Sequence, residues 1–569
     1  MKLIRVNTKS KVVKEENFDR NILLGNRGLV AKIINEEVNP KCDPLGAENK
    51  IVFCTGLFAG TIIPTSGRLS VGGKSPLTGG IKEANAGGNV ASSMAAHGIK
   101  AIIFEDKPED NNLYIFRVKA NGEFEYVLSN EYREMGTYEL VEKLYERYGN
   151  NISVCAIGPA GERRCKAATL QVSEQTTGHP ARAAARGGLG AVMGSKNVKA
   201  LVIEKPEKRV QIEYEDKALF DDAARKIIDI IKNHQNTKGL SMMGTSVYTD
   251  ATAPMGALPV KNFKGEFLPE EKLQKINAKA FITRAKEHGG RTGVACQPGC
   301  IVKCSNIINN EKGEMITSGL EYETLALCGP NCDINDLDKI AKMDRICDDF
   351  GIDTIEFGNA IAIAMDAGII EWGNFNEVLR LTEEMYRGEG LGNIIAHGAK
   401  AVGNALNHHR VPTVKNQALA AYDPRAIKGL GVTYATSTMG ADHTAGHTLG
   451  AAVKHSSKEG QVELSKQYQR VVAVADNTMC LFGWVPISKE GAFGEFIQAL
   501  KGIYGGEWDI NRLFSIGAET LTLERNFNIK AGLTSNDDRL PEFFLRETAP
   551  SIGTTFDITD KEIDAMYTS

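Results

Sequence analysis

Apolar and polar positions are arranged differently in the two parts of the chain. In the N-terminal third, short apolar runs lie between glycine-rich turns, and the runs at 51–60, 67–73 and 99–106 predict strands. Residues 88–98 predict a small helix packed on those strands, and 187–204 predict a glycine-rich turn followed by a strand. This part of the chain is therefore predicted to be β-rich.

The pattern changes after Pro206, where apolar residues recur at three- and four-residue spacing with charges between them. This spacing is typical of amphipathic helices, and it predicts helices at 216–235, 335–351, 354–368 and 376–390. We expect an α+β protein, with a β-rich N-terminal base domain at 1–205 followed by two mainly helical domains at 206–415 and 416–569.

Composition excludes several function classes. Of the 569 residues, 42% are hydrophobic and 24% charged, and 67 basic against 71 acidic side chains give a net charge of -4. This balance predicts no binding to nucleic acid or to an anionic membrane. The start of the chain lacks an apolar signal segment, and no apolar run reaches the roughly 18–20 residues that span a bilayer. We therefore expect a cytoplasmic protein.

The cysteines point to a metal centre. There are eleven, an odd number, and without a signal segment they argue against a secreted disulfide scaffold. Cys296, Cys300 and Cys304 recur at four-residue intervals in "ACQPGCIVKCSN", where Pro298 and Gly299 predict a loop.

The three cysteines of this loop allow several interpretations. An iron–sulfur cluster needs four thiolates, and Cys480 in "DNTMCLFGW" is the distant candidate for the fourth, with Cys328 and Cys332 as rivals. A structural zinc site would pair the loop with Cys328 and Cys332. Ordinary buried cysteines are the third interpretation.

Longer motifs occur in a characteristic order along the whole chain. They are "SGRLSVGGKSPLTGGIKEANAGG" (66–88), "RAAARGGLGAVMGSKN" (182–197), "EYETLALCGPNCDINDL" (321–337), "CDDFGIDT" (347–354), "MGADH" (439–443) and "ERNFNIKAGL" (524–533). In this order and content the chain resembles the aldehyde:ferredoxin oxidoreductase family.

The resemblance implies a tungsten or molybdenum bis-pterin cofactor buried between the domains, Mg²⁺ bridging the two pterin phosphates, and one [4Fe-4S] cluster. By position in the motifs, Cys296, Cys300, Cys304 and Cys480 would hold the cluster. The cofactor-binding positions that the resemblance implies are Arg68, Asn85, Gly87, Gly88, Arg182, Ala183, Gly187, Gly188, Asp348, Asp353 and Asp476.

Glu323 and His443 match the two family residues beside the metal and are the predicted catalytic pair. A glutamate whose pKa is raised by burial can take a proton from water. A histidine can donate a hydrogen bond to the substrate carbonyl, which favours the build-up of negative charge. His447 is a weaker candidate for a supporting role.

The chain departs from the family pattern at three places. The cysteine loop has one residue more in its first interval, and the segment before Cys480 is one residue shorter, which puts the pterin contact of Asp476 in question. Where some members hold a bridging iron, this chain reads "KMDR" (342–345), and a lysine and an arginine predict that no bridging metal is bound.

The function that the resemblance implies is oxidation of aldehydes to carboxylic acids, with electrons leaving through the cluster to ferredoxin or an iron–sulfur partner subunit. Related tungsten enzymes acting on 2-hydroxy acids, or reducing acids or aromatic acyl-CoA, are the alternative, and a zinc-stabilised protein without enzymatic activity is a second one. A homodimer or a hetero-oligomer is compatible with the sequence.

Overall fold

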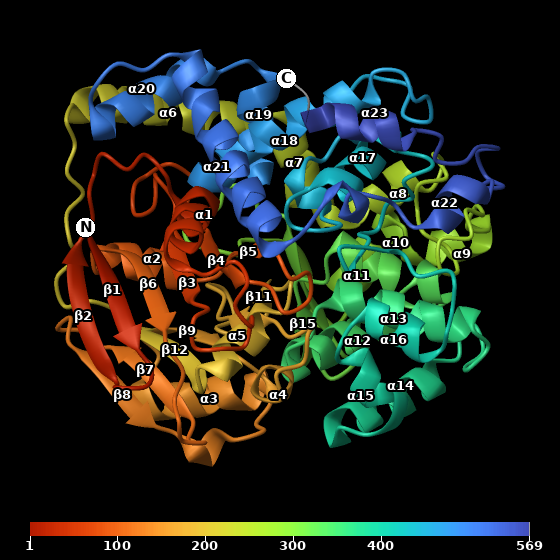
Figure 1. Ribbon diagram of the computed structural model, residues 1–569, viewed down its shortest axis with the longest axis horizontal. Coiled ribbons are helices and arrows are strands. Elements are labelled where there is room, and N and C mark those ends of the chain that lie inside the picture. Colours follow the sequence, from red (N-terminus) through yellow and green to blue (C-terminus); the bar gives the residue numbers. More distant parts are fainter. Residues whose placement is uncertain (568–569) are drawn as a thin grey trace.

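The computed structural model describes residues 1–567, and its N-terminal part contains two six-stranded sheets (Figure 1). The first sheet has the order β2-β1-β6-β3-β4-β5, and the second has the order β11-β10-β9-β12-β7-β8. All neighbours are antiparallel except the parallel pairs β1–β6 and β7–β12. The strands are β1 (Lys2–Asn7), β2 (Val12–Asn17), β3 (Ile51–Thr55), β4 (Leu69–Lys74), β5 (Ile81–Ala86), β6 (Ile99–Glu105), β7 (Tyr114–Val118), β8 (Phe124–Leu128), β9 (Ile152–Ala156), β10 (Leu170–Val172), β11 (Arg182–Ala184) and β12 (Val198–Glu204).

The two sheets pack face to face around a shared apolar core. Side chains from both sheets belong to one buried cluster, in which Phe104 of β6 meets Phe116 of β7 edge to face at 5.4 Å between ring centroids. The helices of this part are α1 (Asn26–Glu37), α2 (Val90–Ala96), α3 (Thr137–Tyr148), α4 (Pro159–Glu162) and α5 (Leu189–Ser195). The central strands are buried on both faces, so they read as continuous apolar runs.

Helices cover the outer faces of both sheets. Helix α1 packs on β3, β4 and β5 of the first sheet, and α3 packs on β9 of the second. Helices α6 (Lys217–Asn233) and α20 (Phe493–Tyr504) pack against each other beyond α1, so a segment just after the base lies beside one from the C-terminal part (Figure 1).

The rest of the chain is mainly helical and surrounds the largest apolar core. Its other helices are α7 (Gln235–Met243), α8 (Val247–Thr252), α9 (Glu270–Ile276), α10 (Ala278–Lys286), α11 (Tyr322–Leu327), α12 (Leu337–Phe350), α13 (Thr354–Asp366), α14 (Phe375–Arg387), α15 (Gly390–Ile395), α16 (Ala399–Ala405), α17 (Lys428–Thr436), α18 (Gln461–Thr478), α19 (Leu481–Lys489), α21 (Ile510–Ala531), α22 (Glu542–Arg546) and α23 (Asp560–Asp564). Short strands interrupt the helices: β13 (Arg291–Val294), β14 (Ser305–Asn309), β15 (Met315–Ser318), β16 (Thr413–Val414) and β17 (Gln417–Ala418).

The α+β prediction, with a β-rich base first and helices afterwards, is confirmed. The four helices predicted from periodicity correspond to α6, α12, α13 and α14. The strand predicted at 51–60 ends at Thr55, where the chain turns away from the sheet. The glycine-rich turn before β12 also contains α5, which the sequence did not indicate because its glycines and small residues give no amphipathic pattern. Within residues 1–567, no helix is both long and apolar enough to cross a membrane.

Candidate functional site

One cavity of about 730 Å³ lies between the sheet base and the helices. Its walls come from β5 and β11 of the base and from α11, α12, α18 and α19 of the helical part. The sequence-predicted site residues that line it are Arg68, Asn85, Gly87, Arg182, Ala183, Cys296, Cys300, Cys304, Glu323, Asp348, Asp353, His443, Asp476 and Cys480. The fold thus brings together residues that are hundreds of positions apart in the chain.

Three chain segments meet around the four cysteines. The loop between β13 and β14 carries Cys296, Cys300 and Cys304, and the amide of Thr65 donates to the carbonyl of Gly299 in this loop at 3.3 Å. The Cys480 amide donates in turn to the Thr65 carbonyl at 3.0 Å. Cys480 therefore lies beside the loop, at the N-terminus of α19.

Arg68 lies among these thiols. The Arg68 side chain is half-buried; burial lowers the pKa of its guanidinium, but the electrostatic effect of the four neighbouring cysteines outweighs this and raises the pKa overall. A hydrogen bond from the Cys300 thiol, together with the charges of Arg182 and Arg68, lowers the pKa of Cys296 to about 6 although burial opposes it. Burial raises the pKa of Cys480, and Arg68 opposes that rise. The site therefore holds at least one thiol with marked thiolate character.

Cys328 and Cys332, the rivals for the fourth position, lie elsewhere. Both are fully buried in the helical core, and the Cys332 thiol donates to the carbonyls of Leu327 and Gly358 at 3.2 and 3.3 Å. Neither lines the cavity. Within residues 1–567, no group of three or more Cys, His, Asp or Glu side chains is gathered closely enough to hold a single metal ion. The arrangement does not support a zinc site shared by the two groups of cysteines.

Gly87 forms a close-fitting part of the cysteine site. A Cβ at this position would lie 3.1 Å from the Cys296 sulfur and 3.3 Å from Nη1 of Arg68. Arg68 also donates through Nε to Oδ1 of Asn85 and through Nη2 to the Asn85 carbonyl at 3.2 Å. The end of β5 thus positions the arginine against the cysteines.

The other predicted glycines pack against protein and do not line the cavity. Gly88 donates its amide to the Cys296 carbonyl at 2.9 Å, and a Cβ there would lie 2.5 Å from Val172. Gly187 and Gly188 have φ of +84° and +74°, a region that favours glycine, and they allow the turn before α5 to pass close to Lys82 and to the Lys166 carbonyl. Their conformation explains these glycines without a direct ligand contact.

Arg182 connects the base to the cysteine loop. Its Nη2 lies 2.8 Å from Oε2 of Glu174 and 2.6 Å from Oγ of Ser305, the residue after Cys304. Nη1 lies 3.4 Å from Glu321. Ala183, its neighbour in β11, pairs with Gln171 of β10. The Arg182 guanidinium is therefore held both by the base, through Glu174, and by the segment that follows the cysteine loop, through Ser305.

Two of the predicted aspartates have different surroundings. Burial raises the pKa of Asp348 well above its usual value, and the neighbouring Asp344 carboxylate acts in the same direction. Asp353 caps α13 by accepting from the Ile355 amide at 3.0 Å, and its Oδ2 lies 3.4 Å from Nε of Arg186. Asp348 lines the cavity as a carboxyl group that holds its proton more tightly than an exposed aspartate does, whereas Asp353 is an ion-paired helix cap.

Asp476 lines the cavity and is also tied to the base. Its Oδ2 lies 3.0 Å from Nη1 of Arg27 on α1, and Arg27 makes two further hydrogen bonds, of 2.8 and 2.9 Å, to Glu524 of α21. Burial raises the pKa of Asp476 to about 6, against the charge of Arg27.

Glu323 and His443 form a close pair on the cavity wall. Nε2 of His443 lies 3.2 Å from Oε1 of Glu323, and Oε2 of Glu323 accepts from the Ala421 amide at 2.7 Å. Burial raises the pKa of Glu323, and the charge of His443 opposes this rise. Nδ1 of His443 is buried without a hydrogen-bond partner among the described residues. The pair combines a carboxylate of raised basicity with an imidazole.

Several cavity residues were missed by sequence reasoning. Lys82 lies 2.7 Å from Asp442, the residue before His443, and Arg186 donates to the Ala441 carbonyl at 2.5 Å. His447, which the sequence did indicate as a candidate for a supporting role, also lines the cavity, and burial lowers its pKa to about 3, so this imidazole is neutral. Lys82 and Arg186 lie within the motifs identified in the sequence. A basic residue in a strand or turn predicted to be buried could have indicated that they belong to the site.

Comparison with known proteins identifies the class. Residues 3–205 match the family model "Aldehyde ferredoxin oxidoreductase, N-terminal domain", and residues 222–569 match "Aldehyde ferredoxin oxidoreductase, domains 2 & 3". Tungsten-containing aldehyde ferredoxin oxidoreductases of Pyrococcus furiosus and Pyrococcus horikoshii are each 32% identical, over 96% of this chain and 92% of theirs. The active-site complex BamBC of benzoyl coenzyme A reductase has the same fold, with a TM-score of 0.80 and 18% identity over 100% of this chain and 93% of that chain.

These matches define the protein as an enzyme of the oxidoreductase class. The chain belongs to the aldehyde ferredoxin oxidoreductase family, because both parts of the family model match and the relatives are similar over nearly its whole length.

Proposed function

We propose that this protein oxidises aldehydes to carboxylic acids with a tungsten or molybdenum bis-pterin cofactor. Electrons would leave through one [4Fe-4S] cluster to ferredoxin or to an iron–sulfur partner subunit. The observation that carries the proposal is that the Glu323–His443 pair and the four cysteines line one and the same cavity. The two Pyrococcus relatives are named as tungsten-containing enzymes, which favours tungsten over molybdenum as the metal of the proposed cofactor.

The residues present fit these groups. Cys296, Cys300, Cys304 and Cys480 offer the four thiolates that a [4Fe-4S] cluster requires, and the space beside Gly87 would be filled by a side chain at that position. The cavity also gathers buried carboxyl groups and arginines, which suit the polar edges and phosphates of two pterins.

The proposal assigns each group a set of holding residues. Arg68 and Arg182 would hold the cluster and the cofactor, Asp348 and Asp476 would bind the pterins, and the carbonyls of Asn85 and Ala183 would bind Mg²⁺. The remaining proposed contacts are Gly87 and Asp353, while Gly88, Gly187 and Gly188 would act only through the backbone turns that they allow. When bound, the metal–pterin group accepts two electrons from the substrate and the cluster passes them on singly.

Glu323 is proposed as the general base. Its raised pKa makes it a better proton acceptor near neutral pH than an exposed glutamate. The amide of Ala421 holds Oε2 at 2.7 Å and so orients the carboxylate, which leaves Oε1 facing His443. Oε1 would take the proton of the water whose oxygen is transferred to the aldehyde.

His443 is proposed to bind the carbonyl oxygen of the substrate. With Nε2 near Glu323, the imidazole lies where it can donate a hydrogen bond to an oxygen that gains negative charge in the reaction. The neutral His447 ring lies 5.6 Å from the His443 ring, between centroids, and adds no competing charge.

Elemental analysis of protein purified without oxygen tests the proposal. We expect about one tungsten or molybdenum and about four irons per chain, together with oxidation of an aldehyde coupled to reduction of a ferredoxin or a viologen dye. A Cys480→Ser variant should lose iron, whereas Cys332→Ser should keep it. Zinc alone, in a colourless protein without aldehyde oxidation, would contradict the proposal.

We further propose the domain division 1–205, 206–415 and 416–569 and a cytoplasmic location. The first boundary is supported by the end of β12 at Glu204 and by the family model that ends at residue 205.

A further inference from the structure

One side of the cavity differs chemically from the rest. The charged cavity residues lie mainly on the base, α11 and α12, while the wall made by α7, α8, α19, residues 467–471 of α18 and the segment after His447 carries few charges. The main lining residues on this side are Tyr248, His447, Gln467, Val471, Phe482 and Lys489. We call this side the aromatic chamber.

A series of ring contacts connects the chamber to the catalytic pair. The His443 ring lies 5.7 Å from Tyr422, Tyr422 meets His447 edge to face at 4.7 Å, and His447 lies 6.5 Å from Tyr248. Tyr248 stacks on Phe482 with centroids 6.3 Å apart and an angle of 18° between the rings. The rings form one continuous wall that begins beside the catalytic histidine.

The chamber reaches the surface at its far end. Three residues of the lining, Asn236, Gln467 and Lys489, are exposed, whereas Tyr248, Phe482 and Val471 of the same lining are half-buried. Lys489, at the end of α19, is the chamber's one fully charged side chain among residues 1–567, because His447 is neutral. A substrate that enters here passes from a polar rim to apolar and aromatic surfaces.

We propose that this chamber is the substrate site and that it selects uncharged aldehydes with a flat aromatic body. The proposal rests on the proposed aldehyde oxidation and adds to it the substrate class and the residues that select it. A flat ring can stack on Tyr248 and Phe482, and such ring pairs add to the attraction that comes from burying apolar surface. Its carbonyl would then point along the ring wall toward His443 and Glu323.

The same chamber disfavours anionic substrates. A carboxylate moved along this wall beyond Lys489 at the rim would lose its hydration without meeting another cation, which is costly. The cations Lys82 and Arg186 lie on the other side of the cavity and are already engaged, with Lys82 on Asp442 at 2.7 Å and Arg186 on Asp353 at 3.4 Å. The chamber therefore argues against 2-hydroxy acids and acyl-CoA, whose carboxylate or phosphates would cross the apolar wall.

Steady-state kinetics of the metal-loaded enzyme test the selection. We expect Phe482→Ala to raise KM for benzaldehyde about tenfold, or about 1.4 kcal/mol, and to change KM for acetaldehyde less than about twofold. The matched control is Phe514→Ala, because Phe514 is also half-buried and contacts Phe493 at 5.4 Å but does not line the cavity. Glyoxylate, an aldehyde that carries a carboxylate, should be a poor substrate.

A binding measurement separates this inference from the proposed function. Calorimetric titration of the purified enzyme with benzamide, which is flat, uncharged and not oxidised, should show tighter binding than acetamide, and Phe482→Ala should remove the difference. Tyr248→Leu gives a second variant should Phe482→Ala fold poorly.

The outcomes differ for the two proposals. Loss of benzamide binding in Phe482→Ala with no aldehyde oxidation by the wild type would support the chamber and contradict the proposed function. Aldehyde oxidation with equal binding of benzamide and acetamide, or equal effects of Phe482→Ala and Phe514→Ala, would overturn the chamber. Efficient oxidation of glyoxylate would overturn the exclusion of anions.

Discussion

At the scale of single residues, the surroundings of Glu323 determine the orientation of its carboxylate and shift its pKa from that of an exposed glutamate. Its carboxylate is anchored through one oxygen by the Ala421 amide and faces His443 through the other. Burial raises its pKa, so the carboxylate becomes protonated at a higher pH than an exposed glutamate would.

Replacing this side chain should abolish most of the activity. In Glu323→Gln the amide cannot accept the proton, and we expect aldehyde oxidation to fall by about 10²-fold or more. Steady-state rates measured over a pH series check this. Glu323→Asp is the conservative control, which should retain more activity than the glutamine variant.

The pH profile has a predicted sign. If Glu323 is the base as proposed, it works in its deprotonated form; because its pKa is raised, wild-type kcat should fall as pH decreases through a value above the usual glutamate pKa. The residual activity of Glu323→Gln should lack this acid limb. An unchanged acid limb in the variant would rule out Glu323 as the titrating base.

Gly87 carries a prediction for the cysteine site. A methyl group there would approach both the Cys296 sulfur and the Arg68 guanidinium at 3.1 and 3.3 Å, which is closer than ordinary contact. We expect Gly87→Ala to weaken cluster binding by about tenfold or more, seen as lower iron content and visible absorbance. Gly494→Ala, at an exposed position where a Cβ meets nothing within 4 Å, should keep both.

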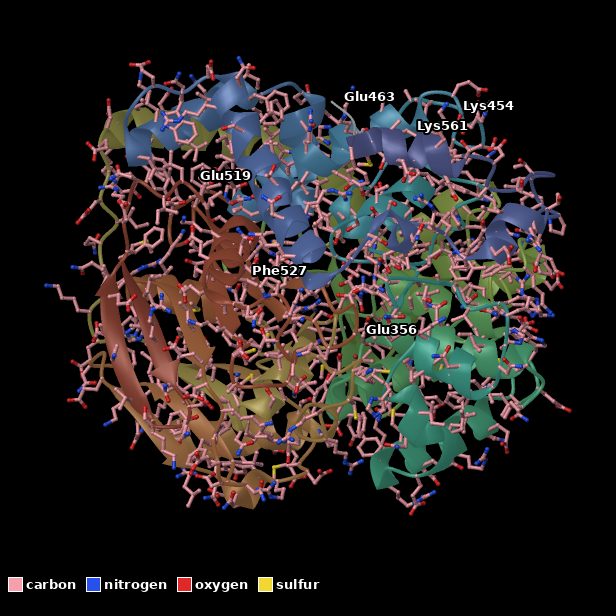
Figure 2. All side chains as sticks on the ribbon, in the orientation of Figure 1. Glu356, Lys454, Glu463, Glu519, Phe527 and Lys561 are labelled. Carbon is pink, nitrogen blue, oxygen red and sulfur yellow. The ribbon has the colours of Figure 1, made fainter. Side chains whose placement is uncertain are left out.

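At the scale of secondary structure elements, the pair α18 and α21 holds two parts of the cavity in place. Helix α18 carries Asp476 and leads into Cys480, and it packs along α21 in one of the larger helix contacts of the protein. Phe527 of α21, labelled in Figure 2, is fully buried and so anchors this helix in the core.

Gly517 sets the closeness of this contact. A Cβ on Gly517 of α21 would lie 2.3 Å from the Arg470 carbonyl of α18, so a side chain must push the helices apart. Gly517→Ala should therefore destabilise the fold by about 1–3 kcal/mol, measured as a lower thermal midpoint. The exposed Gly494→Ala variant again provides the control, and equal midpoints would show that the contact adapts freely.

The buried acid Glu356 also has a structural role, in the helical part of the protein around α13. Glu356 of α13 accepts from the amides of Ala399 and Ala418 at 3.0 and 2.7 Å, which fixes α16 and β17 to α13 (Figure 2). Its Oε1 lies 4.0 Å from Arg186. Helices and strands around the cavity are thus joined by polar contacts that sequence periodicity does not reveal.

At the scale of the whole molecule, ion pairs connect the base to the C-terminal helices. Arg27 of α1 contacts Glu524 of α21 and Asp476 of α18, and Thr438 donates to the same Glu524 carboxylate at 2.5 Å. All of these contacts are remote in sequence, and Arg27 and Glu524 are almost fully buried.

Breaking this network should be costly. Arg27→Met leaves Glu524 buried without its partner, and we expect a loss of about 3–5 kcal/mol, measured as faster irreversible inactivation at a fixed temperature. The double variant Arg27→Met, Glu524→Leu should recover part of the loss because no unpaired carboxylate remains there. A single variant as stable as the wild type would contradict a stabilising role.

Much of the molecule was determined by the sequence itself. Alternating apolar runs and turns predicted the β-rich base, and three- and four-residue periodicity predicted α6, α12, α13 and α14, because these patterns report which face of an element is buried. The order of motifs predicted the family, and it singled out Glu323, His443 and Cys480 as residues of one site.

Tertiary structure alone decided how these residues meet. It put Cys480 rather than Cys328 or Cys332 beside the cysteine loop, and it turned Gly187 and Gly188 toward protein packing rather than the cavity. It also assembled the aromatic chamber from separate helices and loops. Local patterns encode the burial of each element, but contacts between distant segments depend on how the elements pack, and no local pattern carries that information.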